Sequence, residues 1–208
     1  MIEMDNWVSK LSEELLKPLP GAEAQLRMSP SIRRPFSESQ PLKKGGVLLL
    51  IYPHHASMHT VFIKRSEYGG IHSGQISLPG GMYEENDVTL LRTALREAME
   101  ETGLSADKIE IIGQLTPLNI PVSNTDVFPY VGISHERPAF NHDPSEVQYL
   151  IETSIDELLN PVNRKHKIME IGGNQVEVPY FDIQHNHIWG ATAMILSEFL
   201  EIIRRTMC

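Results

Sequence analysis

The sequence has almost no cysteine. Its one cysteine is Cys208, so no disulfide can form within the chain and a cysteine-rich zinc site is excluded. Proteins that work in reducing compartments rarely depend on disulfides. We therefore expect a cytoplasmic protein. A hydrophobic content of 41% is ordinary for a globular protein and argues against wholesale disorder.

Long hydrophobic runs are also missing. The longest strongly apolar run, Val47–Tyr52, is far too short to cross a bilayer. The N-terminus lacks the basic start and apolar stretch of a secretory signal, so no membrane association is expected. A length of 208 residues fits one domain, with two small domains as the alternative. We place a single domain over 1–208, with 1–44 as an N-terminal helix and irregular lead-in and 45–208 as the core.

Positive charge is scarce. The chain has 18 Lys and Arg against 27 Asp and Glu, a formal net charge of -9. Proteins that bind nucleic acid usually present a basic face to the phosphates, so nucleic acid is not an expected partner. A small anionic substrate remains compatible with this charge if bound metal ions bring positive charge with them.

Hydrophobic periodicity and turn residues predict alternating helices and strands. The predicted helices cover 5–17, 88–102, 155–159 and 188–205. The predicted strands cover 47–52, 60–64, 109–115, 127–133, 147–152 and 176–181, the first two as an antiparallel pair. Residues 22–44 are expected to be irregular. Trp189 is expected to lie in the core. This order predicts an α/β fold with a mixed sheet.

The helix predicted over 88–102 carries a group of carboxylates. A helix turns about 100° per residue, so Glu97, Glu100 and Glu101 share one arc about 100° wide. These like charges repel one another, and the helix dipole disfavours negative charge near the C-terminal end. A divalent cation would reverse this, because carboxylate oxygens suit Mg²⁺ or Mn²⁺. The alternative interpretation is a solvated acidic face.

Residues around this helix predict its ends and its orientation. Asp87 is a plausible N-cap, and Gly103 stands where a left-handed residue ends a helix. Four apolar residues opposite the carboxylates are expected to face the core: Val88, Leu91, Leu95 and Met99. Before the helix, Gly80 and Gly81 allow a close approach of the backbone, whose carbonyl could become a further ligand.

The segment that ends at Leu104 resembles the Nudix box, G-x5-E-x7-R-E-U-x-E-E-x-G-U, in which U is a bulky apolar residue. The matching residues are Gly81, Arg96, Glu97, Glu100, Glu101, Gly103 and Leu104. Asp87 replaces the first Glu, eight rather than seven residues separate it from Arg96, and Ala98 is small for its apolar position. The resemblance implies a Nudix-type α/β/α sandwich with a mixed β-sheet, and metal-dependent hydrolysis of a diphosphate linkage.

The resemblance also implies roles for single residues. The expected metal ligands for Mg²⁺ or Mn²⁺ are Glu97, Glu100, Glu101 and the carbonyl of Gly81 or Gly80. Glu100 and Arg96 are the expected catalytic residues of the helix, and Arg96 would orient it by pairing with Asp87 or Glu85. Glu146, just before a predicted strand, is the candidate general base, with a solvated loop carboxylate as the alternative.

Residues before the box resemble the signature of the coenzyme A pyrophosphatase branch, L-L-T-x-R-[SA]-x3-R-x3-G-x3-F-P-G-G. The residues in register are Arg65, Ser66, Gly74, Pro79, Gly80 and Gly81, whereas Ile63, Gly70 and Leu78 replace the expected Thr, Arg and Phe. The longer spacing before Arg96 and the run Trp189–Ala193 also resemble this branch. It implies cleavage of coenzyme A or acyl-CoA to adenosine 3′,5′-bisphosphate and 4′-phosphopantetheine or its acyl form.

Three residues near this signature are candidates for substrate binding. Arg65 offers a planar fork for a phosphate, although an ordinary surface arginine is the alternative. Ser66 and His72 are the other two, with a plain loop histidine as the alternative for His72. Other Nudix substrates such as ADP-ribose, a dinucleotide or a nucleoside triphosphate stay open, as does a non-catalytic binding module. A homodimer is compatible with the sequence.

Overall fold

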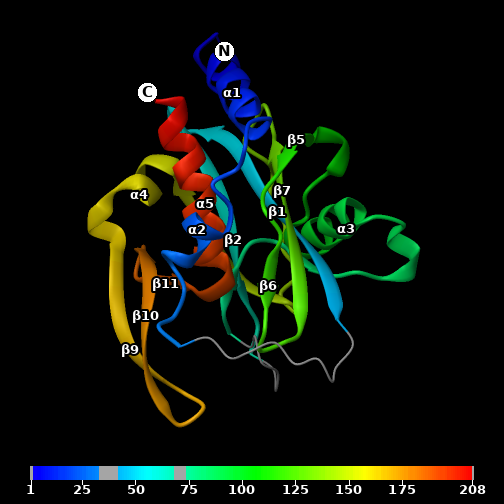
Figure 1. The fold of residues 1–208 in the computed structure, drawn as a ribbon. Coiled ribbons are helices and arrows are strands. Elements are labelled where there is room, and N and C mark those ends of the chain that lie inside the picture. The colour runs from blue at the N-terminus through cyan, green and yellow to red at the C-terminus, as the bar shows by residue number, and fades with distance from the viewer. Residues whose placement is uncertain (1, 33–41, 68–73, 208) are drawn as a thin grey trace.

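The structure is a computed structural model that describes residues 2–32, 42–67 and 74–207. A mixed β-sheet lies between α3 on one side and α5 with α1 and α2 on the other, and a second, smaller sheet lies on the side away from α3 (Figure 1). The predicted α/β/α sandwich with a mixed sheet is confirmed. Within the described residues, no helix is both long and apolar enough to span a membrane.

The larger sheet has eight strands in the part of the chain that the structure describes. They are β1 Lys43–His54, β2 Ser57–Arg65, β3 Ile76–Ser77, β4 Gly80–Met82, β5 Glu110–Gln114, β6 Leu118–Ile120, β7 Thr125–Ile133 and β8 Val147–Ser154. β1 runs parallel to β7 and antiparallel to β2 and β4, which makes the sheet mixed. β2 also pairs with β3 and β8, so β3 lies beside β2 whereas β4 lies beside β1. The predicted antiparallel pair formed by 47–52 and 60–64 is confirmed.

The smaller sheet consists of β9 Arg164–Ile171, β10 Asn174–Ile183 and β11 Asn186–Trp189. Both of its pairings are antiparallel. In Figure 1 these strands lie at the lower left, whereas α3 lies at the right. The sequence predicted β10 but neither β9 nor β11.

The described helices are α1 Ile2–Leu15, α2 Gly21–Leu26, α3 Leu90–Thr102, α4 Ile155–Leu159 and α5 Gly190–Thr206. Short 3₁₀ turns cover Glu85–Asp87, Ala106–Lys108 and Pro161–Asn163. Helix α2 lies in a region that was expected to be irregular. It is held by the fully buried carboxylate of Glu198, which accepts hydrogen bonds from Gly21 N at 3.1 Å and Gln25 Nε2 at 2.9 Å. This contact spans most of the chain, so no local pattern could have predicted it.

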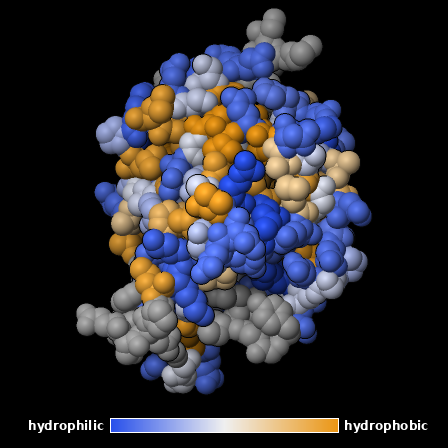
Figure 2. All heavy atoms as spheres, turned by 90° about the vertical axis from the view of Figure 1, so that its right-hand side faces the viewer, coloured by the Kyte–Doolittle hydropathy of each residue, from blue (hydrophilic) through white to orange (hydrophobic). Residues whose placement is uncertain are grey.

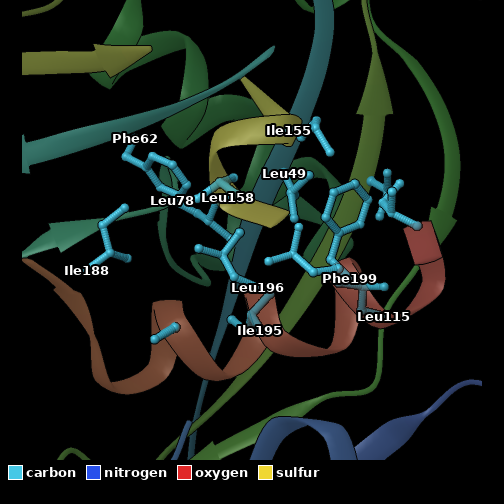
Figure 3. Close-up of a cluster of buried hydrophobic side chains, with 14 of the residues drawn as sticks. Leu49, Phe62, Leu78, Leu115, Ile155, Leu158, Ile188, Ile195, Leu196 and Phe199 are labelled. Atoms are coloured by element: carbon cyan, nitrogen blue, oxygen red, sulfur yellow. The ribbon is translucent and has the colours of Figure 1, made fainter. Parts of the chain in front are cut away.

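Two hydrophobic clusters fill the two sides of the larger sheet. On the side of α5, Leu49 and Phe62 pack with Leu196 and Phe199 (Figure 3). On the side of α3, the cluster includes Val61 of β2 together with Leu48, Leu50 and Ala98. Neighbouring residues of β2 therefore face opposite layers, as expected for a strand buried on both faces.

Helix α3 packs on β1 through its smallest residues. Ala94 and Ala98 are fully buried, and a Cβ added to Gly46 would lie 2.3 Å from the carbonyl oxygen of Leu90. The expectation that Val88, Leu91, Leu95 and Met99 face the core is wrong for Val88 and Met99, which are 79% and 43% exposed. Leu95 does pack against the core cluster on this side, and Leu91 is partly buried. Glycine in β1 lets the helix approach closely, so alanines make the contact.

The start of α3 also differs from the prediction. The helix begins at Leu90, and its N-cap is Thr89, whose side chain accepts a hydrogen bond from Arg92 N at 3.2 Å. Asp87 instead ends the preceding 3₁₀ turn, where its carboxylate accepts hydrogen bonds from Glu84 N and from Arg96. Gly103 ends the helix in the left-handed conformation, as predicted.

We expect two substitutions on α3 to differ clearly in their effect on stability. Ala94→Leu should lower the free energy of unfolding by about 1–3 kcal/mol, because the added atoms cannot fit against Gly46. Met99→Ala should change it by about 0.5 kcal/mol or less, whereas a core Met would cost about 2–5 kcal/mol. Urea denaturation measures both. A large loss for Met99→Ala with none for Ala94→Leu would contradict the observed orientation of the helix.

Candidate active site

The carboxylates of α3 lie beside β4, where the helix meets the strand that carries Gly80 and Gly81. Figure 2 shows this face of the molecule, with hydrophilic side chains gathered in its middle beside hydrophobic ones. Close packing of α3 on β1 brings the helix to β4, because β4 is the antiparallel neighbour of β1. The site is therefore built from one helix and one short glycine-rich strand.

Glu101 is the most buried of the three box glutamates, with an exposed fraction of 1%. Its Oε2 accepts a hydrogen bond from Gly80 N at 2.8 Å, and its Oε1 lies 3.0 Å from a guanidinium nitrogen of Arg65. Burial raises the pKa of Glu101 to about 7, against the opposing effects of Arg65 and of the Gly80 N–H. The negative charges of Glu97 and Glu146 raise it further. Positive charge near this carboxylate therefore stabilises its ionised form.

Glu97 lies directly over Gly81. A Cβ added to Gly81 would be 2.3 Å from the carboxyl carbon of Glu97, so any larger residue there would displace the carboxylate. Burial raises the pKa of Glu97, and the charge of Arg96, 3.0 Å from its Oε1, opposes that shift. The predicted grouping of Glu97, Glu101 and the Gly80–Gly81 backbone is therefore present in the fold.

Arg96 is held by Asp87. Two nitrogens of its guanidinium donate to the two carboxylate oxygens of Asp87, at 2.7 and 3.1 Å. Of the two partners that the sequence left open, Asp87 rather than Glu85 makes this contact. Hydrogen bonding from Arg96 holds the pKa of Asp87 well below its usual range, and Thr93 Oγ1 and Glu84 N donate to the same carboxylate. This bidentate pair joins the turn before α3 to the middle of the helix.

Glu100 differs from the other two box glutamates because its side chain is 53% exposed. It forms an ion pair with Arg96 at 3.0 Å, one helical turn away. The guanidinium of Arg96 therefore contacts Asp87, Glu97 and Glu100 at once. It partly neutralises two of the three box carboxylates.

Arg65, at the end of β2, reaches the same site from the other direction. One of its nitrogens donates to the carbonyl of Gly80 at 2.7 Å and lies 3.0 Å from Glu101. The sequence predicted a phosphate contact for Arg65 and did not predict that it neutralises Glu101. An arginine has five N–H donors, so the two roles are compatible. Nothing local in the sequence linked Arg65 to Glu101.

The other sequence candidates lie at different distances from this centre. Ser66 follows Arg65, and its N donates to the carbonyl of Glu146 at 2.8 Å. Glu146 is exposed just before β8, and its negative charge raises the pKa of Glu101. His72 lies outside the described residues.

The donors fit a hard divalent cation. Among the described residues, no three Asp, Glu, His or Cys side chains already converge closely enough to hold a metal ion. Two carboxylates whose charged forms burial disfavours nevertheless lie beside the Gly80–Gly81 backbone, and Arg65 contacts both Glu101 and the Gly80 carbonyl. Oxygen donors of this kind suit Mg²⁺ or Mn²⁺, and the carboxylates of Glu97, Glu100 and Glu101 are the side chains of α3 that could hold the ion.

Removing Asp87 should cost stability in a pH-dependent way. We expect Asp87→Asn to lower the free energy of unfolding by about 1.5–3 kcal/mol at neutral pH, because a charge-assisted pair is lost. The folded pKa of Asp87 is below the value of about 3.9 in an unfolded chain. Its contribution is therefore complete above about pH 4 and is lost as the pH falls toward the folded pKa.

Denaturation of wild type and Asp87→Asn between neutral and acid pH tests this expectation. The exposed neighbour offers a matched control, Glu85→Gln, which should change stability little at any pH. A stability difference that does not shrink on acidification would show that the Asp87 carboxylate stabilises the fold through something other than its charge.

Comparisons with known proteins agree with this geometry. A profile of the NUDIX domain family matches residues 43–170. The Nudix hydrolase NudL of Klebsiella pneumoniae (strain 342) is 31% identical over 203 residues, which cover 95% of this chain and 93% of that protein. "Nudix hydrolase 22, chloroplastic" of Arabidopsis thaliana is 34% identical over 161 residues, 74% of this chain. The chain spans about half the length of such plant relatives, 53% in this case.

Solved structures show the same fold at low sequence identity. The Nudix hydrolase RenU from M. smegmatis has a TM-score of 0.52 and 13% identity, covering 83% of this chain and 92% of its own. The MutT protein from Methanosarcina mazei Go1 has a TM-score of 0.50 and 19% identity, covering 81% of this chain and 97% of its own. Together with the profile match over more than half of the sequence and the full-length similarity to NudL, these findings place the chain in the Nudix family.

Proposed function

We propose that the protein hydrolyses a diphosphate linkage with the help of Mg²⁺ or Mn²⁺. The observation that carries this proposal is the pair formed by Glu97 and Glu101 beside the Gly80–Gly81 backbone. Burial makes both carboxylates costly to ionise unless a cation lies near them. The helix also brings their like charges close together, which adds to that cost. A purely structural acidic face would be solvated instead. Membership of the Nudix family supports the same reaction.

The chain's own residues have distinct roles in this mechanism. Glu97, Glu100, Glu101 and the Gly81 carbonyl would hold the metal, which neutralises substrate charge and activates water when bound. Arg96, fixed by Asp87, keeps Glu97 and Glu100 in place. Arg65 favours the ionised form of Glu101 and has donors left for a substrate phosphate. Glu146 is the candidate that accepts a proton from the attacking water, since its charge already acts on the site.

Within this reaction class we propose coenzyme A or acyl-CoA as substrate. The products are adenosine 3′,5′-bisphosphate and 4′-phosphopantetheine or its acyl form. Support comes from the partial signature at 61–81, because its residues Arg65 and Gly80 meet at Glu101 rather than at separate places. Ser66, the next residue of the signature, donates its backbone N–H to the carbonyl of Glu146, so these two residues lie side by side. A cytoplasmic location fits the single cysteine, and a small-molecule substrate fits the acidic composition.

Purified protein should release adenosine 3′,5′-bisphosphate from coenzyme A in Mg²⁺ or Mn²⁺ and lose all activity in excess chelator. Glu101→Gln should lower kcat by at least about a hundredfold, because one ligand and its charge are lost. A circular dichroism spectrum like that of wild type would show that the variant folds. Full activity in chelator would refute the metal assignment. A much larger kcat/KM for ADP-ribose, a dinucleotide or a nucleoside triphosphate would refute coenzyme A as substrate and leave the metal chemistry standing.

Arg65→Ala should affect both kinetic constants. Loss of a phosphate contact should raise KM, and loss of the counter-ion of Glu101 should lower kcat. Together we expect kcat/KM to fall roughly tenfold to a hundredfold. Arg65→Lys should restore only part of this, because an ammonium group cannot replace the planar fork. Steady-state kinetics at saturating metal measure the split. An unchanged KM would leave Arg65 with the single role of positioning Glu101.

A further inference from the structure

A second polar pocket lies on the other side of the larger sheet from the carboxylates. It is an open pocket of about 360 Å³, and residues of β2, β3, β8, β9 and β11 line it. Its polar and aromatic side chains include Lys64, Tyr149, Lys167, His187 and Trp189. Trp189 was expected in the core. It is instead only partly buried and lines this pocket, so its role is not restricted to packing.

The pocket concentrates positive charge in an acidic protein. Nζ of Lys167 lies 3.1 Å from Nδ1 of His187, 5.1 Å from the ring centroid of Tyr180 and 6.0 Å from that of Trp189. Among the described residues, no carboxylate forms an ion pair with Lys167. Burial lowers the pKa of Lys167.

The groups around Lys167 do not replace that counter-ion. Asp182, the carboxylate on the neighbouring strand, is engaged 2.6 Å from Lys165. Lys64 donates to the carbonyl of Gly74, and the side chain of Glu67 lies near that glycine without forming an ion pair with Lys64 within the described part of the chain. Two ammonium groups therefore face one pocket, and an anion of the ligand would satisfy both.

Two side-chain hydrogen bonds fix the elements that surround this pocket. The hydroxyl of Tyr149 donates to Oδ1 of Asn186 at 2.9 Å, which joins β8 to β11. The hydroxyl of Thr192 donates to the carbonyl of Ile76 at 3.2 Å, which fixes the start of α5 against β3. Both contacts hold Trp189 and Gly190 at the rim. The run Trp189–Ala193, which stood out in the sequence, thus shapes the pocket.

The position of the pocket shows which part of a ligand it can hold. Lys64 and Arg65 are neighbours on β2, yet Lys64 lines this pocket and Arg65 reaches Glu101. The faces of a sheet are separated by about the thickness of a side-chain layer, so one diphosphate cannot occupy both places. We therefore take an anion held by Lys64 and Lys167 to be a group separate from the diphosphate at Glu101.

We propose that this pocket binds a phosphate monoester on the nucleoside half of the substrate, outside the diphosphate that is cleaved. This proposal rests on the proposed function, which places the diphosphate at Glu97 and Glu101. The two lysines supply charge for a dianionic phosphate, and the aromatic rings of Tyr149 and Trp189 supply faces on which a base or ribose can pack. Coenzyme A carries such a phosphate on its ribose, whereas 3′-dephospho-coenzyme A does not.

The test compares kcat/KM for coenzyme A with that for 3′-dephospho-coenzyme A in three proteins. Wild type should prefer coenzyme A by roughly tenfold or more, the effect of one charge-assisted contact. Lys167→Met should reduce this preference at least about threefold, because it removes one of the two lysines that would contact the phosphate. Lys165→Met is the matched control, because it removes the same charge from the same strand but from a lysine paired with Asp182, and it should keep the preference.

Equal kcat/KM values for the two substrates in wild type would overturn the proposal, as would an equal loss of preference in Lys165→Met. If the protein cleaves neither substrate, coenzyme A is refuted as the substrate. Calorimetry without metal then tests separately whether the pocket binds a phosphate monoester. Tighter binding of adenosine 3′,5′-bisphosphate than of adenosine 5′-monophosphate in wild type, abolished by Lys167→Met, would then support the pocket. Equal binding of the two nucleotides would refute it.

Discussion

The site depends on the burial of one carboxylate, that of Glu101. A carboxylate taken out of water is costly unless its oxygens are hydrogen-bonded and its charge is paired. Here Gly80 N and Arg65 provide both, from two different strands. The end of β2, the strand β4 and the helix α3 are therefore tied together at one point. Removing any one of these partners leaves an uncompensated group in the interior.

The close approach of α3 to β1 makes this contact geometrically feasible. With Ala94 against Gly46, the helix lies low on the sheet, and Glu97 comes to rest over Gly81. A helix held away by leucine and methionine side chains could not place both carboxylates beside the backbone of β4. The apolar residues Val88 and Met99 are exposed as a result of the same orientation. Small residues at this interface thus serve the chemistry as well as the packing.

Much of the fold could be predicted from the sequence, because β-rich runs mark β1 and β2, helical spacing marks α1, and Pro161 marks the end of α4. The strands β3 and β4 have two and three residues, too few for a period to show, and α2 exists because of the distant Glu198. In the site, the shared arc of the three glutamates followed from helical geometry alone. Their unequal burial did not, since it depends on Gly46 and Arg65. Pairing of Arg96 with Asp87 needed the fold to distinguish it from Glu85.

A net charge of -9 conflicts with an anionic substrate only if charge is averaged over the molecule. The structure separates it: carboxylates gather on the α3 side of the sheet, and Lys64 and Lys167 face a pocket on the other side. A cation would neutralise the first group, and the second would attract an anion directly. An acidic chain can in this way bind a substrate that carries several phosphates.

Calorimetric titration of Mn²⁺ into wild type, Glu101→Gln and Glu85→Gln tests the central claim most directly, because it needs no substrate. We expect Glu101→Gln to weaken Mn²⁺ binding at least about tenfold, a difference of about 1.4 kcal/mol. Glu85→Gln removes an equal charge from the exposed turn before α3 and should bind as wild type does. Wild-type affinity in Glu101→Gln, or an equal loss in both variants, would contradict the claim that the buried carboxylate of α3 is a metal ligand.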